Sequence, residues 1–118
     1  MKLPDADRAF IDIKKLRDYS LNPNHPKGKH KARVFLEKLE FDANDAERLL
    51  KLIMEAILTG EATEQQPTSY GRRFIVDFQV TREEKFVVMS TPIRTAWIIR
   101  NGEDFPRLTS CFILRRRL

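Results

Sequence analysis

Two histidines and several basic residues lie together in one short stretch of the chain. The segment HPKGKHKAR, residues 25–33, holds both histidines of the protein, His25 and His30, and no acid. Its cations are Lys27, Lys29, Lys31 and Arg33. Histidine exchanges a proton near neutral pH, and cations stabilise a phosphate. Residues of these types can supply the base, the acid and the cations that cleavage of RNA by its own 2′-hydroxyl requires.

The backbone context of this segment favours phosphate binding. His25 precedes Pro26 and is therefore biased toward an extended conformation, so we expect a helix to begin shortly afterwards. Lys29, His30 and Lys31 would then lie near the first turn, where free backbone N–H groups attract anions. We expect His25 and Lys31 to be catalytic, and Lys29 and His30 to bind phosphate.

A purely structural explanation stands beside this interpretation. His25 can hydrogen-bond a backbone carbonyl at the helix entry, and Gly28 can serve only to provide a backbone conformation. Lys31 can form a buried ion pair with an acid such as Asp77. These roles need no ligand, and the sequence leaves both explanations open.

Hydrophobic spacing predicts three helices in the first half of the chain. Asp12 is suited to cap a short first helix. A second helix should begin within residues 25–39, where Ala32, Phe35, Leu36 and Leu39 have helical spacing. A third should begin at Asn44 as its N-cap and end at Gly60. Its buried stripe would consist of Leu49, Leu52, Ile53, Ala56 and Ile57.

The second half of the chain has the two-residue period of β-strands. In residues 72–80, apolar positions from Phe74 to Val80 alternate with polar ones. Further β-branched and aromatic runs follow at residues 83–91, 93–100 and 107–114. Four strands with short connections predict an antiparallel meander. Helices followed by strands predict an α+β fold, with three N-terminal helices packed on one face of a four-stranded antiparallel sheet.

The face of the sheet turned away from the helices is the second source of candidate residues. Arg73 is expected there, as a phosphate ligand. In the last run we expect Leu108 and Phe112 to face the helices, which puts Arg107 and Thr109 on the open face. These two residues would supply a cation and a hydroxyl to a catalytic site shared with the histidine segment.

Length and composition suit one domain. The chain has 118 residues, of which 42% are hydrophobic, and this fraction is sufficient for a core. We expect a single domain over residues 1–118, with a helical half at 1–60, a polar linker at 61–71 and a sheet half at 72–118. The sheet half ends in the basic run Arg115, Arg116 and Arg117.

The same composition excludes several classes of protein. The charged N-terminus differs from a signal peptide and no apolar run reaches the length of a membrane span, so we expect a cytoplasmic protein without a membrane partner. The single Cys111 excludes an internal disulfide and a cysteine-cluster metal site. His25 and His30 lack metal-ligand spacing, so we expect neither a metal nor a cofactor.

One segment resembles the pattern of a known family. Residues 15–35 read K-L-x-x-Y-x-L-N-x-x-H-P-x-G-x-x-K-A-x-x-F. This resembles an uncharacterised bacterial family of domains of unknown function, whose members occur free-standing and at the C-terminus of polymorphic toxins. The segment TAWIIRNGEDFPRLTS, residues 95–110, fits the same family, so the resemblance covers nearly the whole chain. A looser similarity in element order links it to barnase/RelE-like nuclease toxins, which cut RNA without metal.

The resemblance implies RNA as substrate and an antitoxin or immunity protein as partner. Two further classes remain beside a nuclease-like toxin domain. One is a nucleic-acid-binding module without catalysis, which would use the same basic segment. The other is a protein-interaction or antitoxin-like accessory protein, whose interface would be an exposed sheet edge and the open face.

Overall fold

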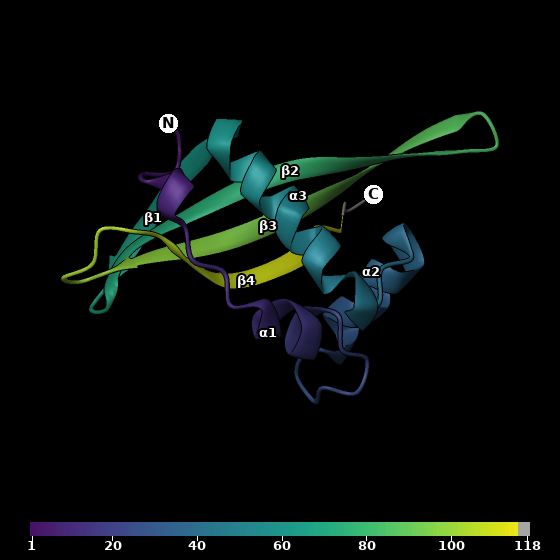
Figure 1. The fold of residues 1–118 in the computed structure, drawn as a ribbon, viewed down its shortest axis with the longest axis horizontal. Coiled ribbons are helices and arrows are strands. Elements are labelled where there is room, and N and C mark those ends of the chain that lie inside the picture. The colour runs from purple at the N-terminus through teal and green to yellow at the C-terminus, as the bar shows by residue number, and fades with distance from the viewer. Residues whose placement is uncertain (116–118) are drawn as a thin grey trace.

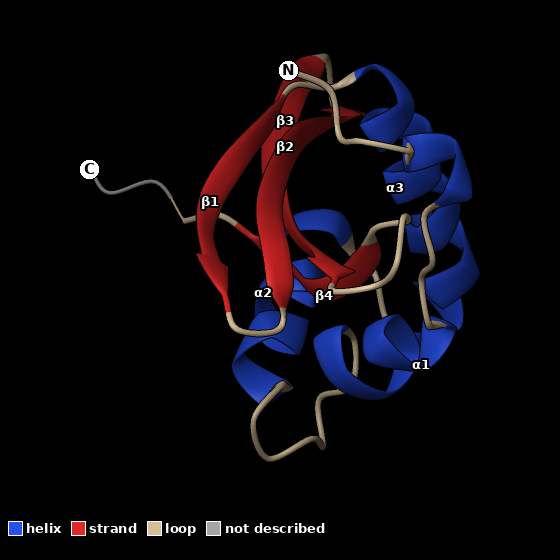
Figure 2. Cartoon of the chain, turned by 90° about the vertical axis from the view of Figure 1, so that its left-hand side faces the viewer, coloured by secondary structure: helices blue, strands red, loops and turns tan. Residues whose placement is uncertain are grey.

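The computed structural model describes residues 1–115 of the chain. Its helices are α1 (Ile13–Lys15), α2 (Lys29–Leu39) and α3 (Ala46–Thr59). Its strands are β1 (Ala62–Thr68), β2 (Gly71–Glu84), β3 (Val87–Arg100) and β4 (Arg107–Ile113). The helices cover one side of the sheet (Figure 1 and Figure 2), so the expected α+β fold is confirmed. Of the basic run at the C-terminus, Arg116 and Arg117 lie outside the described residues.

Short turns complete the helical part. A 3₁₀ turn, η1 (Ala6–Arg8), precedes α1, and α1 continues directly into a π-helical turn, η2 (Leu16–Ser20). The side chain of Asp12 accepts a hydrogen bond of 3.0 Å from the backbone N–H of Lys14, so it caps α1 as expected. No helix in the described part of the chain is long and apolar enough to cross a membrane.

The third helix begins differently from the prediction. A 3₁₀ turn, η3 (Ala43–Asp45), leads into α3, and Asp42 and Asp45 form a capping box around it. Asn44 is therefore not the N-cap, because the Asp42 side chain accepts from the Asn44 N–H instead. The stripe of α3 packs in the core, where Leu49, Ile53 and Ile57 are fully buried. On α2, by contrast, Leu36 is 54% exposed and does not belong to the core.

The sheet is an antiparallel meander in the order β1-β2-β3-β4, as expected. The prediction of a linker at residues 61–71 is wrong, because most of this segment forms β1. β1 is an edge strand whose side chains are almost all solvent-exposed, so it lacks the alternating apolar signal of a half-buried strand. Pro67 falls where the register shifts between Gln65 and Thr68, a position that spares it a ladder hydrogen bond.

Two of the predicted strands are one continuous strand. The chain turns at Lys85 and Phe86, and β3 then runs through Pro92, which the sequence suggested as a break. The carbonyl of Pro92 accepts a hydrogen bond from the N–H of Leu114, just beyond the end of β4. The N–H and C=O of one strand residue point to the same side, so the N–H that proline lacks would face Leu114, and only this last hydrogen bond of the β3–β4 ladder is lost.

The face predictions hold for β2 and fail in part for β4. Phe74 and Val76 are buried under the helices, while Arg73 is exposed. In β4 the register shifts: Leu108 pairs with Trp97, whereas Ser110 pairs with Ala96, which makes Thr109 the extra residue of a bulge. This bulge reverses the alternation beyond it, so Cys111 rather than Phe112 shares the helix-facing side with Leu108.

Candidate functional site

The loop before α2 is held together by the side chain of His25. Its Nδ1 atom accepts hydrogen bonds of 3.0 Å from the backbone N–H groups of Lys27 and Gly28. His25 thus stabilises the helix entry by accepting from N–H groups, whereas the structural alternative expected it to bond a carbonyl. Its ring also lies against that of Tyr19, with 4.6 Å between the ring centroids.

Gly28 closes this loop onto the preceding turn. A β-carbon at Gly28 would overlap the backbone carbonyl of Tyr19, so only glycine allows the two backbone segments to meet here. The backbone of Gly28 is in the right-handed region, with φ of −88°, so the requirement is for space rather than for a special conformation. The hydrogen bonds to Nδ1 and the close contact between Gly28 and Tyr19 therefore fix the position of the imidazole.

These hydrogen bonds determine which chemistry His25 can carry out. An imidazole whose Nδ1 accepts two N–H bonds carries its hydrogen on Nε2 when it is neutral. Nε2 is then a hydrogen-bond donor and not a base. A proton on Nδ1 would face the N–H groups of Lys27 and Gly28. The geometry therefore suits His25 to donate a hydrogen bond to an anion without changing its protonation.

A surface hollow of about 560 Å³ lies beside this loop. It brings His25 together with residues of β4 that are more than 80 positions away in sequence, Thr109 and Ser110. Its cations are Lys14, Lys15 and Lys27, and Tyr19 and Asp18 also line it. Asp18 is paired with Arg17 at 3.0 Å. None of the ion pairs formed within residues 1–115 involves the three lysines, so the hollow is positively charged.

Thr109 also lines a second hollow of about 560 Å³, on the open face of the sheet. The bulge of β4 exposes Thr109 between the two hollows. The second hollow is lined by Ile98 and Arg100 of β3 and by two turns that contribute Ser69, Tyr70 and Asn101. Tyr70 is 74% exposed. The two hollows have Thr109 in common, and the pair of hollows is called the Thr109 groove below.

Lys31 lies near this groove but is held by aromatic rings. Its ammonium nitrogen is 5.1 Å from the ring centroid of Tyr19 and 5.2 Å from that of Phe112, so the cation lies between two π faces. The alternative in which Lys31 pairs with Asp77 is wrong. Asp77 instead accepts two hydrogen bonds of 2.9 Å from the guanidinium of Arg94.

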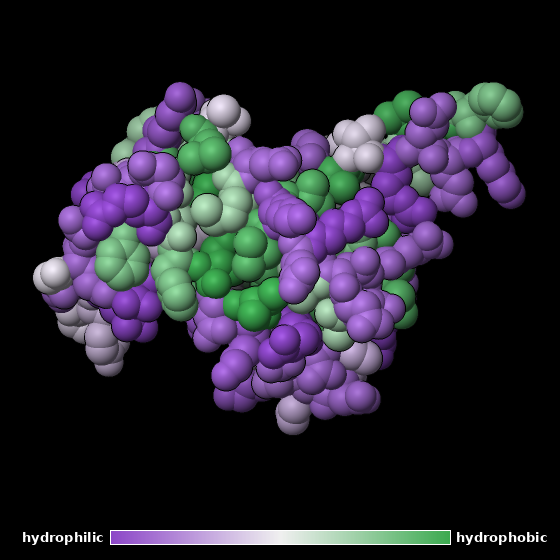
Figure 3. Space-filling view, in the orientation of Figure 1, coloured by the Kyte–Doolittle hydropathy of each residue, from purple (hydrophilic) through white to green (hydrophobic). Residues whose placement is uncertain are grey.

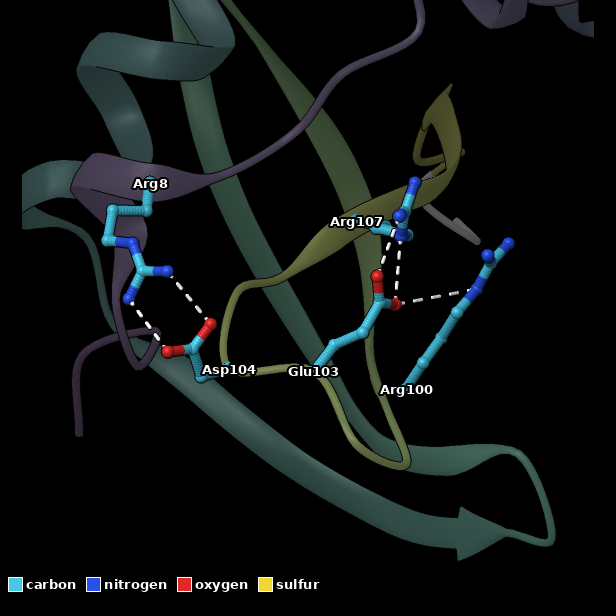
Figure 4. A network of polar contacts seen from close by, with 5 residues as sticks. All are labelled: Arg8, Arg100, Glu103, Asp104 and Arg107. Atoms are coloured by element: carbon cyan, nitrogen blue, oxygen red, sulfur yellow. Dashed lines mark hydrogen bonds and ion pairs between the residues drawn. The ribbon is translucent and has the colours of Figure 1, made fainter.

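Arg107 is engaged away from the histidine loop. Figure 4 shows its guanidinium directed at Glu103, to which it donates hydrogen bonds of 3.0 and 2.7 Å. The same guanidinium lies over the rings of Phe10 and Phe105, at about 5 Å from each centroid. Its hydrogen bonds lower the pKa of Glu103. Arg107 lines neither hollow of the Thr109 groove.

The residues expected to bind phosphate are not gathered at the groove. Lys29 and His30 are exposed in the first turn of α2, and neither lines one of the two hollows. Arg73 is exposed on β2 and donates a hydrogen bond of 3.4 Å to the carbonyl of Gln66. Of the seven predicted residues, the structure brings two together at the groove, His25 and Thr109. Lys31 lies beside them, over the ring of Tyr19.

Sequence reasoning missed several residues of the groove. Lys14 and Lys15 were overlooked because they follow a cap rather than a motif. Tyr70 and Arg100 were overlooked because they flank turns, although the Asn101-Gly102 pair marks one of those turns in the sequence. The signal that could have found them is the coincidence of exposed aromatic and basic residues beside turn residues.

Cys111 contributes no reactive thiol to the groove. Burial raises the pKa of its thiol to about 12, and the nearby charge of Lys31 acts only weakly in the opposite direction. Within residues 1–115, no three His, Cys, Asp or Glu side chains are grouped so that they could hold a metal ion.

Comparison with known proteins identifies one relationship. The search of curated proteins found no match, and the search of solved structures found none. A protein family described as Domain of unknown function (DUF6883) matches residues 2–115, which is almost the whole chain. The chain therefore belongs to the DUF6883 family of domains of unknown function.

Proposed function

We propose that this protein binds single-stranded RNA along the Thr109 groove. The observation that carries the proposal is the position of Thr109, which lines both a lysine-rich hollow beside His25 and a hollow beside the exposed ring of Tyr70. Proteins that bind single strands combine a cationic path for the phosphates with aromatic side chains for the bases. The two hollows provide these two elements side by side.

The lysine-rich hollow suits the phosphates. Lys14, Lys15 and Lys27 supply charge, and His25 supplies a donor at Nε2 whose orientation is fixed by the loop. The hydroxyls of Thr109 and Ser110 add neutral donors. Contacts of this kind recognise the backbone of a nucleic acid and not its base sequence.

The second hollow suits a base. Tyr70 exposes most of its ring, and Arg100 and Asn101 lie beside it. Stacking of a base on such a ring contributes about 1–3 kcal/mol and tolerates any base. A duplex cannot offer an unstacked base to this ring, which is why a single strand is favoured.

RNA cleavage remains the alternative suggested by the resemblance to toxins. His25 would have to act as a base at Nε2, and the two N–H bonds to Nδ1 oppose that role. Arg107 would have to reach the same phosphate, and its guanidinium is held by Glu103. Both observations favour binding over catalysis.

The test is fluorescence anisotropy with a short labelled oligouridine, measured over a range of salt concentrations. The groove variant replaces Lys14, Lys15 and Lys27 with glutamine. It should lose affinity at least tenfold, and its salt slope should become shallower by about 0.7 for each lost phosphate contact. Tyr70→Ala should lose affinity without a change of salt slope, because stacking releases no counterion.

A matched control separates the groove from net charge. Replacing Lys2, Lys51 and Lys85 with glutamine removes the same charge at exposed positions outside both hollows. Equal losses in the two triple variants would show that affinity comes from net charge and would contradict the proposal. The oligonucleotide should be recovered intact from the binding reaction, whereas cleavage that His25→Asn abolishes would support the nuclease alternative.

A further inference from the structure

The β2–β3 hairpin extends well beyond the rest of the sheet. β1 pairs with β2 only up to Val76, and β4 pairs with β3 only from Ile93 onward. The outer part of the hairpin, residues 81–90, is therefore a two-stranded ribbon and is called the arm below (Figure 1). A two-stranded ribbon is marginally stable in water, and further strands are needed to stabilise it.

The end of the arm exposes a continuous apolar segment. Phe86 is 99% exposed, and the segment continues with Val87, Val88 and Met89, which are 57%, 66% and 47% exposed. Figure 3 shows these apolar side chains gathered at the far end of the arm. Lys85 and Phe86 both have positive φ angles, 48° and 67°. Positive φ at both positions is what a two-residue hairpin turn between Glu84 and Val87 requires.

The two edges of the arm differ in charge. The β2 edge carries Arg82, Glu83 and Glu84, and such charges discourage pairing with another strand. The β3 edge, residues 86–91, reads FVVMST and has no charged side chain. A segment with high β-propensity, no charge and no proline or glycine is the kind that pairs with a like strand.

The other edges of the sheet are protected. The β1 edge is short and contains Pro67. At the start of β4, the backbone of Phe10 covers the edge through hydrogen bonds with Pro106 and Leu108. Within residues 1–115, no strand pairs with Val87–Thr91 on the side where β4 would continue. In the part of the chain that the structure describes, the backbone groups on this side of Val87–Ser90 therefore have no strand partner.

We propose that two copies of this chain form a dimer by antiparallel pairing of residues 86–91 across this edge. The segment is complementary to itself when Met89 lies on the two-fold axis, because Val87 then faces Thr91 and Val88 faces Ser90 of the second copy. No charge meets a like charge in this register. The two arms together form one four-stranded ribbon. This number of strands is enough for stability in water, whereas the two strands of one arm are not.

The same register gives Phe86 a place to bind. The pairing ends at Thr91, because the carbonyl of Pro92 is already bonded to the N–H of Leu114. Phe86 of the second copy then comes next to a cavity of about 540 Å³ between the end of α2 and the end of β4. The cavity is lined by residues 89–92 of β3, by Ile113, Leu114 and Arg115 at the end of β4, and by Glu37 and Lys38 of α2. Each copy would therefore bury its fully exposed phenylalanine in the other copy, as a two-fold interface requires.

The first experiment measures mass in solution by light scattering, with protein freed of nucleic acid. The wild type should have twice the mass of one chain, and Val88→Lys should be a folded monomer by circular dichroism. Leu58→Lys makes the same chemical change at an exposed apolar residue of α3 and should remain a dimer. A wild type that stays monomeric from micromolar to millimolar concentration, or a Val88→Lys variant that stays dimeric, would overturn the proposal.

The second experiment tests the register by disulfide formation. Met89→Cys places two cysteines directly opposite each other, at a Cα separation that a disulfide spans. It should crosslink on mild oxidation, and Val87→Cys should not, because residue 87 lies opposite Thr91 in this register. The native Cys111 is buried and does not interfere. Equal crosslinking of the two variants would indicate unspecific association and would overturn the proposed dimer.

Discussion

His25 and Gly28 are joined by a hydrogen bond of 3.0 Å from the backbone N–H of Gly28 to the imidazole Nδ1. The bond joins the first and last residues of the HPxG segment, His25 to Gly28, and so this segment stabilises the local fold. The histidine completes the entry to α2, and its side chain also lines the lysine-rich hollow. Structure and ligand binding can therefore be separated by substitutions at this one residue.

His25→Asn should keep the fold and weaken RNA binding. The asparagine oxygen can accept from the backbone N–H two positions later, so the stability should change by less than about 0.5 kcal/mol. The donor at Nε2 is lost, and a hydrogen bond to a charged group is worth roughly tenfold in affinity. His25→Leu, which removes both functions, should lose about 1–2 kcal/mol of stability as well. Urea unfolding and anisotropy with oligouridine measure the two effects.

Gly28→Ala should destabilise the protein by about 1–3 kcal/mol, the usual cost of overpacking. The added methyl group meets the backbone carbonyl of Tyr19, which cannot move aside as a flexible side chain would. Lys27→Ala, at the exposed neighbouring position, should stay within about 0.5 kcal/mol of the wild type. Urea unfolding of the two variants is the measurement, and equal stabilities would contradict the close approach of the two backbone segments.

The hydrophobic pattern predicted the elements that bury a face and failed for those that do not. The alternation of Phe74 and Val76 with polar residues predicted β2, because these two side chains are buried against the helices. Gln65 lies in a strand that has almost no buried side chain, so its sequence carries no such signal. Pro92 separates two predicted strands but lies inside β3, where it is tolerated because it meets only Leu114, at the very end of the β3–β4 ladder.

The sequence predicted two members of the candidate site, His25 and Thr109, but explains the position of only the first. His25 and Lys27 belong to one loop, and their joint position follows from the HPxG segment. Thr109 reaches the same hollow through a bulge, and the sequence does not encode a bulge as a periodicity. Arg107 was expected at the site because it shares the open face of the last strand with Thr109, but Glu103, four positions earlier, holds its guanidinium.

Cys111 should be unreactive in the folded protein. A thiol with a pKa of about 12 is only about one part in ten thousand thiolate at pH 8, and the thiolate is the reactive form. Ellman's reagent should therefore react slowly with the native chain and rapidly once urea unfolds it. Rapid reaction under native conditions would contradict the burial of this residue.

Acid should weaken the loop between β3 and β4 through Glu103. The hydrogen bonds from Arg107 lower the pKa of this carboxyl in the folded state. The resulting stabilisation is present above the ordinary pKa of glutamate, about 4.3, and is lost as the pH falls below it and the carboxylate takes up a proton. Glu103→Gln should flatten the acid limb of a plot of stability against pH. Both side chains are partly accessible to solvent, so added salt should reduce the difference between the two proteins.

Thr109 and Arg107, two positions apart on β4, should respond in opposite ways to substitution. Thr109→Glu introduces a carboxylate where the two hollows meet, and repulsion of the phosphates should weaken oligouridine binding at least tenfold. Arg107→Gln leaves the groove unchanged and should alter affinity less than about threefold, because one exposed charge outside the path has a small, screened effect. Anisotropy at two salt concentrations distinguishes the outcomes. If Arg107→Gln causes the larger loss, Arg107 contacts the ligand, as the sequence suggested, and pairs with Glu103 only when no ligand is bound.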